Sequence, residues 1–203
     1  MRAWWTRNWP RGDHGIGFDW VGVFQWMQAH PALQASLRLA YISGLPQMAF
    51  VLVFLGFTAR TAQLDEFLGL YFAAVLVVVA LSWPFPAAGP WVHYSLSAML
   101  DASSMSHFAL LREGSLRTLD LEQMQGLIAI PSLHTALAMI LVYAMRATRL
   151  LPVFVLLNGW MILATPIEGG HYVVDVLAGA VLAVLLIAIS RLRAARAFGR
   201  LPS

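Results

Sequence analysis

Residues 126–145, GLIAIPSLHTALAMILVYAM, form an apolar stretch in which His134 is the only ionisable imidazole. The stretch is typical of a helix in lipid, where an ionisable group is costly and by default indicates function. A neutral histidine that hydrogen-bonds to a neighbouring helix is the simpler alternative. Because the apolar segment begins at Pro131, we expect His134 near the start of its helix. Other parts of the sequence are needed to choose between a functional and a structural role for His134.

The composition places the whole chain in a membrane. The 203 residues are 60% hydrophobic and 11% charged, with a mean hydropathy of +0.70, whereas soluble domains carry about 25% charged residues. The length suits one compact bundle. The chain has no cysteine, which excludes disulfides, thiolate metal sites and a cysteine nucleophile. All thirteen basic residues are arginines, and they lie between apolar segments, where charges usually set membrane topology. They form no basic groove, so a nucleic-acid partner is not expected.

The hydrophobic pattern predicts an all-α, polytopic transmembrane helix bundle. Each span needs about 20 mostly apolar residues, or fewer where it meets a recessed site. Five stretches meet this description: Leu39–Thr58, Phe67–Phe85, Pro131–Met145, Leu150–Thr165 and Tyr172–Ser190. Pro46 is expected to kink the first of them. A sixth span around Ile16–Ala35 is left open, although it would bury Asp19 and four other polar residues.

These spans divide the chain into three parts. Residues 1–38 mix tryptophans with charged residues and are interpreted as an N-terminal segment in the membrane interface, with its aromatic rings at headgroup level. Residues 39–190 form the transmembrane catalytic bundle. Residues 191–203 form a basic cytoplasmic tail. No cleavable signal peptide is recognised at the N-terminus.

The arginines predict the orientation of the bundle. Threading five spans with a cytoplasmic C-terminus places seven of them on one side, in agreement with the positive-inside rule: Arg60, Arg146, Arg149, Arg191, Arg193, Arg196 and Arg200. The connection 86–130 and the turn 165–171 then face the opposite side. Arg2, Arg7 and Arg11 do not fit this arrangement.

A second motif, PIEGGHYVVDVLAG at 166–179, carries a histidine and a carboxylate. His171 and Asp175 are four residues apart, so they share one face at the start of the last span. Asp175 can accept a hydrogen bond from one imidazole nitrogen, which fixes the tautomer and leaves the other nitrogen as a nucleophile. His134 and His171 both begin spans from the same side, so we expect the three side chains at one depth near one membrane face.

The surroundings of these residues favour an anionic phosphate substrate. Both histidines begin helices, whose N-termini attract anions, and Gly169 and Gly170 allow the backbone to approach a ligand closely. Arg112 or Arg117, on the same side, can supply a planar fork for phosphate oxygens. The pattern therefore predicts phosphoryl transfer, with His171 attacking phosphorus, Asp175 supporting it and His134 protonating the leaving oxygen.

Two sequences, P-S-L-H-T at 131–135 and G-G-H-Y-V-V-D-V-L-A-G at 169–179, resemble the second and third signature motifs of the type 2 phosphatidic acid phosphatase superfamily. The H-Y-x-x-D form, P-Q-M at 46–48 and F-P-A-A-G-P at 85–90 are closer to its inositol phosphorylceramide synthase-like branch. The resemblance covers residues 18–191 and implies a phosphohistidine at His171, Asp175 as its partner, His134 as acid and later base, and Ser132 as a ligand of the phosphoryl group. It also implies catalysis without a metal or other cofactor.

The chain departs from the family pattern at two places. The family's first motif, a lysine followed after six residues by Arg-Pro, is absent in that form because the chain has no lysine. Thr165 stands where the third motif usually has an arginine. The phosphate-binding residues must therefore be replaced, and Arg112 and Arg117 are the candidates.

These observations leave three classes of function open. The first is a lipid phosphatase, or a phosphotransferase with an alcohol acceptor, that acts on a phospholipid, isoprenoid or sphingolipid-type phosphate. We expect it in a bacterial inner membrane with the active site on the outer side. The second is a metal-dependent hydrolase or metal transporter using His134, His171 and Asp175, although an H-E-x-x-H helix is missing. The third is an inactive membrane protein that retains the fold.

Overall fold

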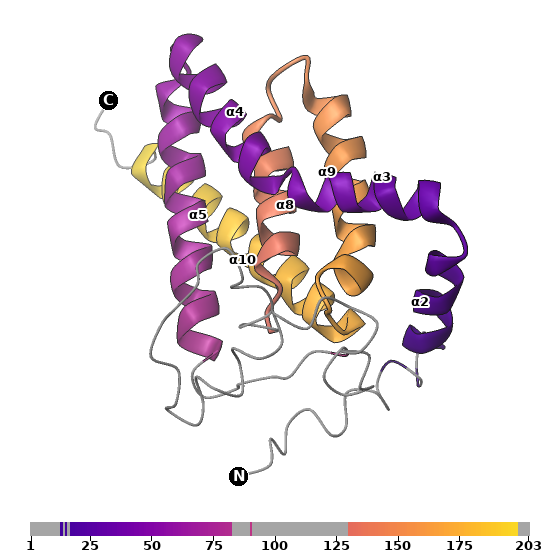
Figure 1. Cartoon of the computed structure of the whole chain (residues 1–203). Coiled ribbons are helices and arrows are strands. Elements are labelled where there is room, and N and C mark those ends of the chain that lie inside the picture. The colour runs from indigo at the N-terminus through magenta and orange to yellow at the C-terminus, as the bar shows by residue number, and fades with distance from the viewer. Residues whose placement is uncertain (1–12, 14, 16, 83–89, 91–129, 199–203) are drawn as a thin grey trace, which may run out of the picture.

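The structure, a computed structural model of the chain, describes residues 13, 15, 17–82, 90 and 130–198. These ranges contain seven helices of regular length and no strand (Figure 1): α2 (Trp20–Gln28), α3 (Pro31–Ile42), α4 (Gly44–Phe57), α5 (Thr61–Ser82), α8 (Leu133–Ala144), α9 (Leu151–Glu168) and α10 (Val173–Phe198). The predicted all-α fold is confirmed.

Each of the five predicted spans coincides with a helix or a pair of helices. Among the described residues, three helices are long and apolar enough to cross a membrane, namely α5, α9 and α10. The pair α3–α4 is a fourth if it is taken as one broken span. Helix α8 has 12 residues and is too short to cross a hydrocarbon core of about 30 Å by itself. Large apolar side chains are exposed, among them Phe57 at 89% and Leu156 at 75%, as expected of an integral membrane protein.

The first span is broken, as Pro46 predicted. Helices α3 and α4 meet at Ser43 with a bend of 45°. Pro46 lies in the first turn of α4, where its missing N–H costs least, and its ring excludes a continuous helix through Ile42. The break is held by side chains: Gln47 donates to the Ser43 hydroxyl at 2.8 Å, and Asn158 of α9 donates to Gln47 at 2.7 Å.

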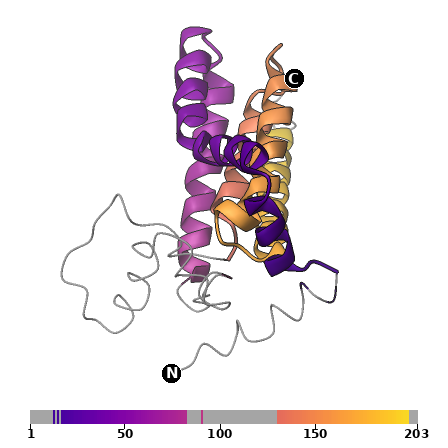
Figure 2. The same ribbon diagram turned by 45° about the vertical axis from the view of Figure 1, so that its right-hand side comes forward.

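Part of the predicted N-terminal segment, from Trp20 on, packs against the bundle. Trp20 is 1% exposed and packs with Phe24, Ala164 and Ile167 in a small core between α2 and α9. The sixth span left open around residues 16–35 is not one helix, because α2 ends at Gln28 and α3 begins at Pro31. Both views show α2 turning away from α3 at the edge of the bundle (Figures 1 and 2).

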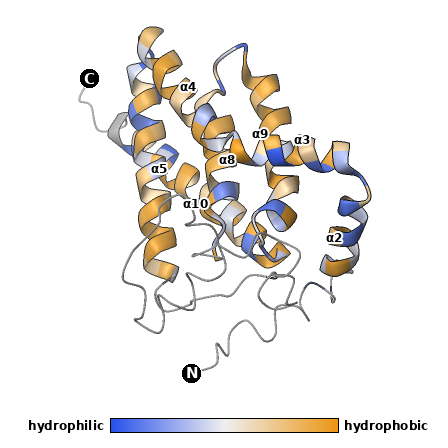
Figure 3. Ribbon diagram, viewed as in Figure 1, coloured by the Kyte–Doolittle hydropathy of each residue, from blue (hydrophilic) through white to orange (hydrophobic). Residues whose placement is uncertain are grey.

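Helix α8 is the centre of the bundle. It contacts α4, α5, α9 and α10, and residues such as Ala136, Ala138 and Ile140 are fully buried. Figure 3 shows the apolar character of α5 and α10 and more hydrophilic residues in α2 and α3. The longer helices surround this short central helix, and His134 in its first turn is half-buried.

Candidate functional site

His171 follows the end of α9 in a turn that fixes its backbone. Gly169 is the C-cap, Gly170 has a φ of +60°, and the His171 N–H donates to the Pro166 carbonyl at 3.1 Å. This is the Schellman arrangement, which needs a left-handed residue after the helix, so glycine at 170 is a conformational requirement. The turn therefore directs the 6% exposed His171 side chain into the protein.

Asp175 lies one turn further along, at the start of α10. Its Oδ2 atom is 3.6 Å from His171 Nδ1 and accepts a hydrogen bond from the Tyr172 N–H at 2.9 Å. The first contact is slightly too long for a hydrogen bond, as is common for catalytic pairs without substrate. The second is half of a capping box, which holds the carboxylate in place. The predicted proximity of His171 and Asp175 is thus present.

The start of α8 is fastened directly to this turn. The Ser132 N–H donates to the Asp175 carbonyl at 3.0 Å, and the Ser132 hydroxyl accepts from the Thr135 N–H at 3.4 Å as the N-cap of α8. Gly179 of α10 lies so close to this point that a Cβ atom there would contact the Ser132 backbone and come within 3.1 Å of Thr135 Cβ. The two helices approach closely because residue 179 has no side chain.

His134, in the first turn of α8, is consequently near His171. The Tyr41 hydroxyl, 3.2 Å from His134 Nδ1, would also be 2.8 Å from a Cβ atom on Gly169, as would His171 Cδ2. The two histidines and Asp175 therefore lie at one end of the bundle. We call His134, His171, Asp175 and Ser132 the histidine end. Helix α5 finishes and α8 begins at this same end of the molecule (Figure 1).

Tyr41 on α3 also belongs to this region, and no sequence pattern indicated it. Its hydroxyl is 3.2 Å from His134 Nδ1, and the two rings stack with centroids 4.2 Å apart at 16°. A Cβ atom on Gly169 would be 2.8 Å from the Tyr41 hydroxyl and 2.8 Å from His171 Cδ2. Tyr41 and His171 thus pack closely against Gly169, where a side chain would not fit.

Two residues of the N-terminal region support the turn from outside. The Trp20 indole donates to the His171 carbonyl at 3.2 Å, and Asp13 Oδ2 accepts from the Val173 N–H at 3.3 Å. The sequence predicted aromatic rings of this segment at headgroup level, and the structure adds that Trp20 is buried in the protein, where its N–H has a partner. A single tryptophan among eight carries no sequence signal for such a contact.

The two arginines predicted to bind phosphate, Arg112 and Arg117, lie outside the described residues. Glu168, the last residue of α9, is half-buried. Among the described residues no group of three or more potential ligand side chains is placed to hold a metal ion.

The opposite end of the bundle carries a second polar cluster. Glu66 of α5 accepts hydrogen bonds from Tyr143 at 2.9 Å and Ser190 at 3.0 Å and pairs with Arg146. Arg60 donates to the Ala147 carbonyl at 3.0 Å. We call these six residues the arginine end. It joins the α4–α5 turn, the α8–α9 turn and α10, so the arginines at 60, 146 and 149 share one end as predicted.

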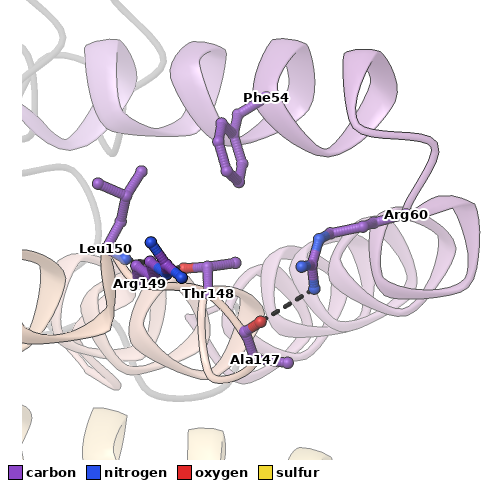
Figure 4. Close-up of a pocket in the computed structure, with 6 residues that line it drawn as sticks. All are labelled: Phe54, Arg60, Ala147, Thr148, Arg149 and Leu150. Carbon is purple, nitrogen blue, oxygen red and sulfur yellow. Dashed lines mark hydrogen bonds between the residues drawn. The ribbon is translucent and has the colours of Figure 1, made fainter.

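A cavity of about 580 Å³ lies at the arginine end, between the end of α4 and the α8–α9 turn (Figure 4). Its lining comprises Phe54, Arg60, Ala147, Thr148, Arg149 and Leu150. None of the predicted site residues lines it. This cavity is therefore not part of the histidine end.

Unsatisfied polar atoms gather at the histidine end, although Asn158 Oδ1, at the contact between α4 and α9, is another. Within the described part of the chain, His171 Nδ1, Asp175 Oδ1 and Thr135 Oγ1 are buried without a hydrogen-bond partner. Buried polar groups are nearly always paired, and exceptions tend to mark sites that act on a ligand. A histidine with a carboxylate behind it and a second histidine on another helix can carry out nucleophilic attack and proton transfer.

Comparison with known proteins identifies the family. A family model described as PAP2 superfamily matches residues 10–189, most of the chain. It includes both histidines, Asp175, Tyr41 and the Trp20 contact to the turn. No curated protein and no solved structure gave a match.

Proposed function

The chain belongs to the PAP2 superfamily, and from this premise we propose that it is a lipid phosphatase that acts through a phosphohistidine on His171. Membership implies a membrane phosphatase-type activity. The proposal adds the substrate class, lipid phosphate esters or anhydrides, and the covalent mechanism. The observation that carries it is the Asp175 carboxylate 3.6 Å behind His171 Nδ1, with His134 supplied by a separate helix.

The first half of the reaction forms the phosphoenzyme. Asp175 holds the proton on His171 Nδ1, so that Nε2 has the lone pair and attacks phosphorus. The bond between phosphorus and the leaving oxygen breaks as the bond to Nε2 forms. Protonated His134 gives its proton to the leaving oxygen, which departs as the lipid alcohol.

The second half returns the enzyme to its starting state. Water attacks phosphorus, the bond to His171 Nε2 breaks, and His134, now neutral, accepts the proton of the water. Phosphate leaves with His134 protonated again. The same two histidines thus serve both half-reactions, because His134 acts as the acid in the first and as the base in the second.

The phosphate group needs donors besides the histidines. We assign this role to Ser132, Gly169 and Gly170, with Arg112 and Arg117 providing positive charge. The connection that carries these two arginines leaves α5 and enters α8, both at the histidine end, which supports their assignment. The Ser132 hydroxyl caps α8 at a long 3.4 Å, so exchanging that bond for a phosphate oxygen costs little.

The alternative is a lipid phosphotransferase that passes a phospho-headgroup, for example phosphoinositol, to a lipid or alcohol. The H-Y-x-x-D, P-Q-M and F-P-A-A-G-P sequences support it, since they resemble the inositol phosphorylceramide synthase-like branch. Both versions share the covalent step and differ in the second acceptor. Supplying detergent-solubilised protein with lipid phosphates, with and without inositol, separates them by product.

The covalent intermediate is the most direct test. After brief exposure to lipid carrying labelled phosphate, we expect acid-labile label on the parent protein and none on His171→Ala. His30→Ala is the matched control, because His30 is exposed and its Nδ1 contacts the Trp26 carbonyl 2.8 Å away, far from the site. Label on His171→Ala equal to that on the parent would refute the assignment.

Two further parts of the proposal concern metal and location. Turnover that persists with a chelator and is inhibited by vanadate supports a metal-independent reaction, whereas loss of turnover with chelator would favour the metal hydrolase. The arginine end is assigned to the cytoplasmic side of a bacterial inner membrane and the histidine end to the outer side. Labelling of cysteines introduced at residues 149 and 15 in intact cells tests this orientation.

A further inference from the structure

Tyr41 contacts His134 in two ways at once. Its hydroxyl is 3.2 Å from Nδ1, and its ring stacks on the imidazole at 4.2 Å. The hydrogen bond fixes the direction in which Nδ1 points, and the stacking fixes the plane of the imidazole ring. Because Nδ1 is occupied, Nε2 is the nitrogen that remains for exchange of protons with a substrate.

The position of Tyr41 follows from the break in the first span. Tyr41 is two residues before Ser43, where α3 ends and the chain bends by 45° into α4. The Ser43–Gln47–Asn158 contacts pin this bend to α9. A straight helix would carry residue 41 along the axis of α4, so the break is what turns the phenol toward α8.

The direction of the Tyr41–His134 hydrogen bond follows the tautomer of His134. With the proton on Nδ1, the imidazole donates to the Tyr41 oxygen, and the lone pair of neutral His134 is on Nε2. This is the tautomer that acid–base exchange at Nε2 needs.

We propose that Tyr41 is a positioning residue for proton transfer by His134, and this inference rests on the proposed phosphatase reaction. The Tyr41 oxygen accepts the Nδ1–H bond both when His134 is protonated and after its Nε2 proton has moved to the leaving oxygen. The imidazole therefore keeps one orientation while it changes from acid to base. Its proton always leaves and returns at Nε2.

The test compares two substrates that differ in how much they need a proton. An alkyl lipid phosphate releases a basic alkoxide and depends on the acid, whereas a nitrophenyl phosphate ester releases a stable phenolate without one. Tyr41→Phe keeps the stacking and removes the hydroxyl. We expect kcat to fall about 10- to 100-fold on the alkyl substrate, with KM nearly unchanged and the nitrophenyl ester much less affected.

Control variants separate this role from a structural one. Tyr71→Phe, on α5 beside Phe67, should match the parent on both substrates. Tyr41→Met also lacks the hydroxyl and should show the same selective loss, so it serves if Tyr41→Phe does not fold. Rates like those of the parent, or equal losses on both substrates, would overturn the role of Tyr41. A parent protein that turns over neither substrate would instead refute the proposed function.

Discussion

The two ends of the bundle use similar side chains in different ways. At the arginine end, Glu66 is satisfied by Tyr143, Ser190 and Arg146. At the histidine end, Asp175 Oδ1 and His171 Nδ1 are buried without hydrogen-bond partners among the described residues. Buried polar groups without a hydrogen-bond partner cost stability, and such groups tend to mark sites that act on a ligand. The comparison supports the proposal that the arginine end is structural and that the histidine end carries the reaction.

The largest effect should come from the nucleophile. His171→Ala is expected to lower kcat by about 10³-fold or more, because no other imidazole can replace Nε2 in the covalent step. The melting temperature should stay close to that of the parent, since the turn is held by the Schellman bond and Trp20. Activity equal to that of the parent would remove His171 from the mechanism.

Asp175→Asn should come next, with a loss of about 10²- to 10⁴-fold in kcat. Asparagine retains an oxygen for the Tyr172 N–H but lacks the charge that stabilises the imidazole. The matched substitution at the other end is Glu66→Gln. A loss at 175 no larger than the loss at 66 would erase the distinction between the two ends.

Gly179→Ala tests how closely the two helices must approach at the histidine end. The added methyl would contact the Ser132 backbone, so we expect a loss of about 1–3 kcal/mol in the free energy of unfolding. Activity should fall about 10²-fold because α8 and His134 are displaced. Gly159→Ala is the control, because a Cβ atom added there would meet no neighbouring element within 4 Å; a similar loss there would contradict the close-approach explanation.

Trp20→Phe removes the indole donor to the His171 carbonyl while keeping an aromatic ring in the small core. We expect a loss of about 1 kcal/mol in stability and a modest fall in kcat through a looser turn. Thermal unfolding followed with kinetics on the same sample measures both. Unchanged stability and rate would show that Trp20 does not support the turn.

The smallest effect on activity should come from Glu66→Gln. Arg146 and Tyr143 lose a charged partner, but both are partly exposed, so the expected cost is about 1 kcal/mol in stability. The rate of turnover should remain that of the parent, because the arginine end does not touch the reaction. A fall in kcat comparable with that of Asp175→Asn would mean that the two ends are coupled.

The sequence by itself determined the class of protein and the residues on which the proposed chemistry rests. The apolar stretches predicted the helices, and Pro46 predicted the bend. The spacing of four residues placed His171 and Asp175 on one face, because helical geometry is local and repeats every 3.6 residues. The family suggested by the two histidine motifs is confirmed.

Tertiary structure decided everything that joins distant segments. Tyr41 and His134 are 93 residues apart, and Trp20 and His171 are 151 apart, so no local pattern indicates that they touch. Likewise, Gly179 looked like an ordinary residue of an apolar helix until α8 packed against it. These contacts depend on how the broken helix pair α3–α4 and the short helix α8 cross their neighbours. The packing of the whole bundle sets these crossings, and no single stretch of sequence does.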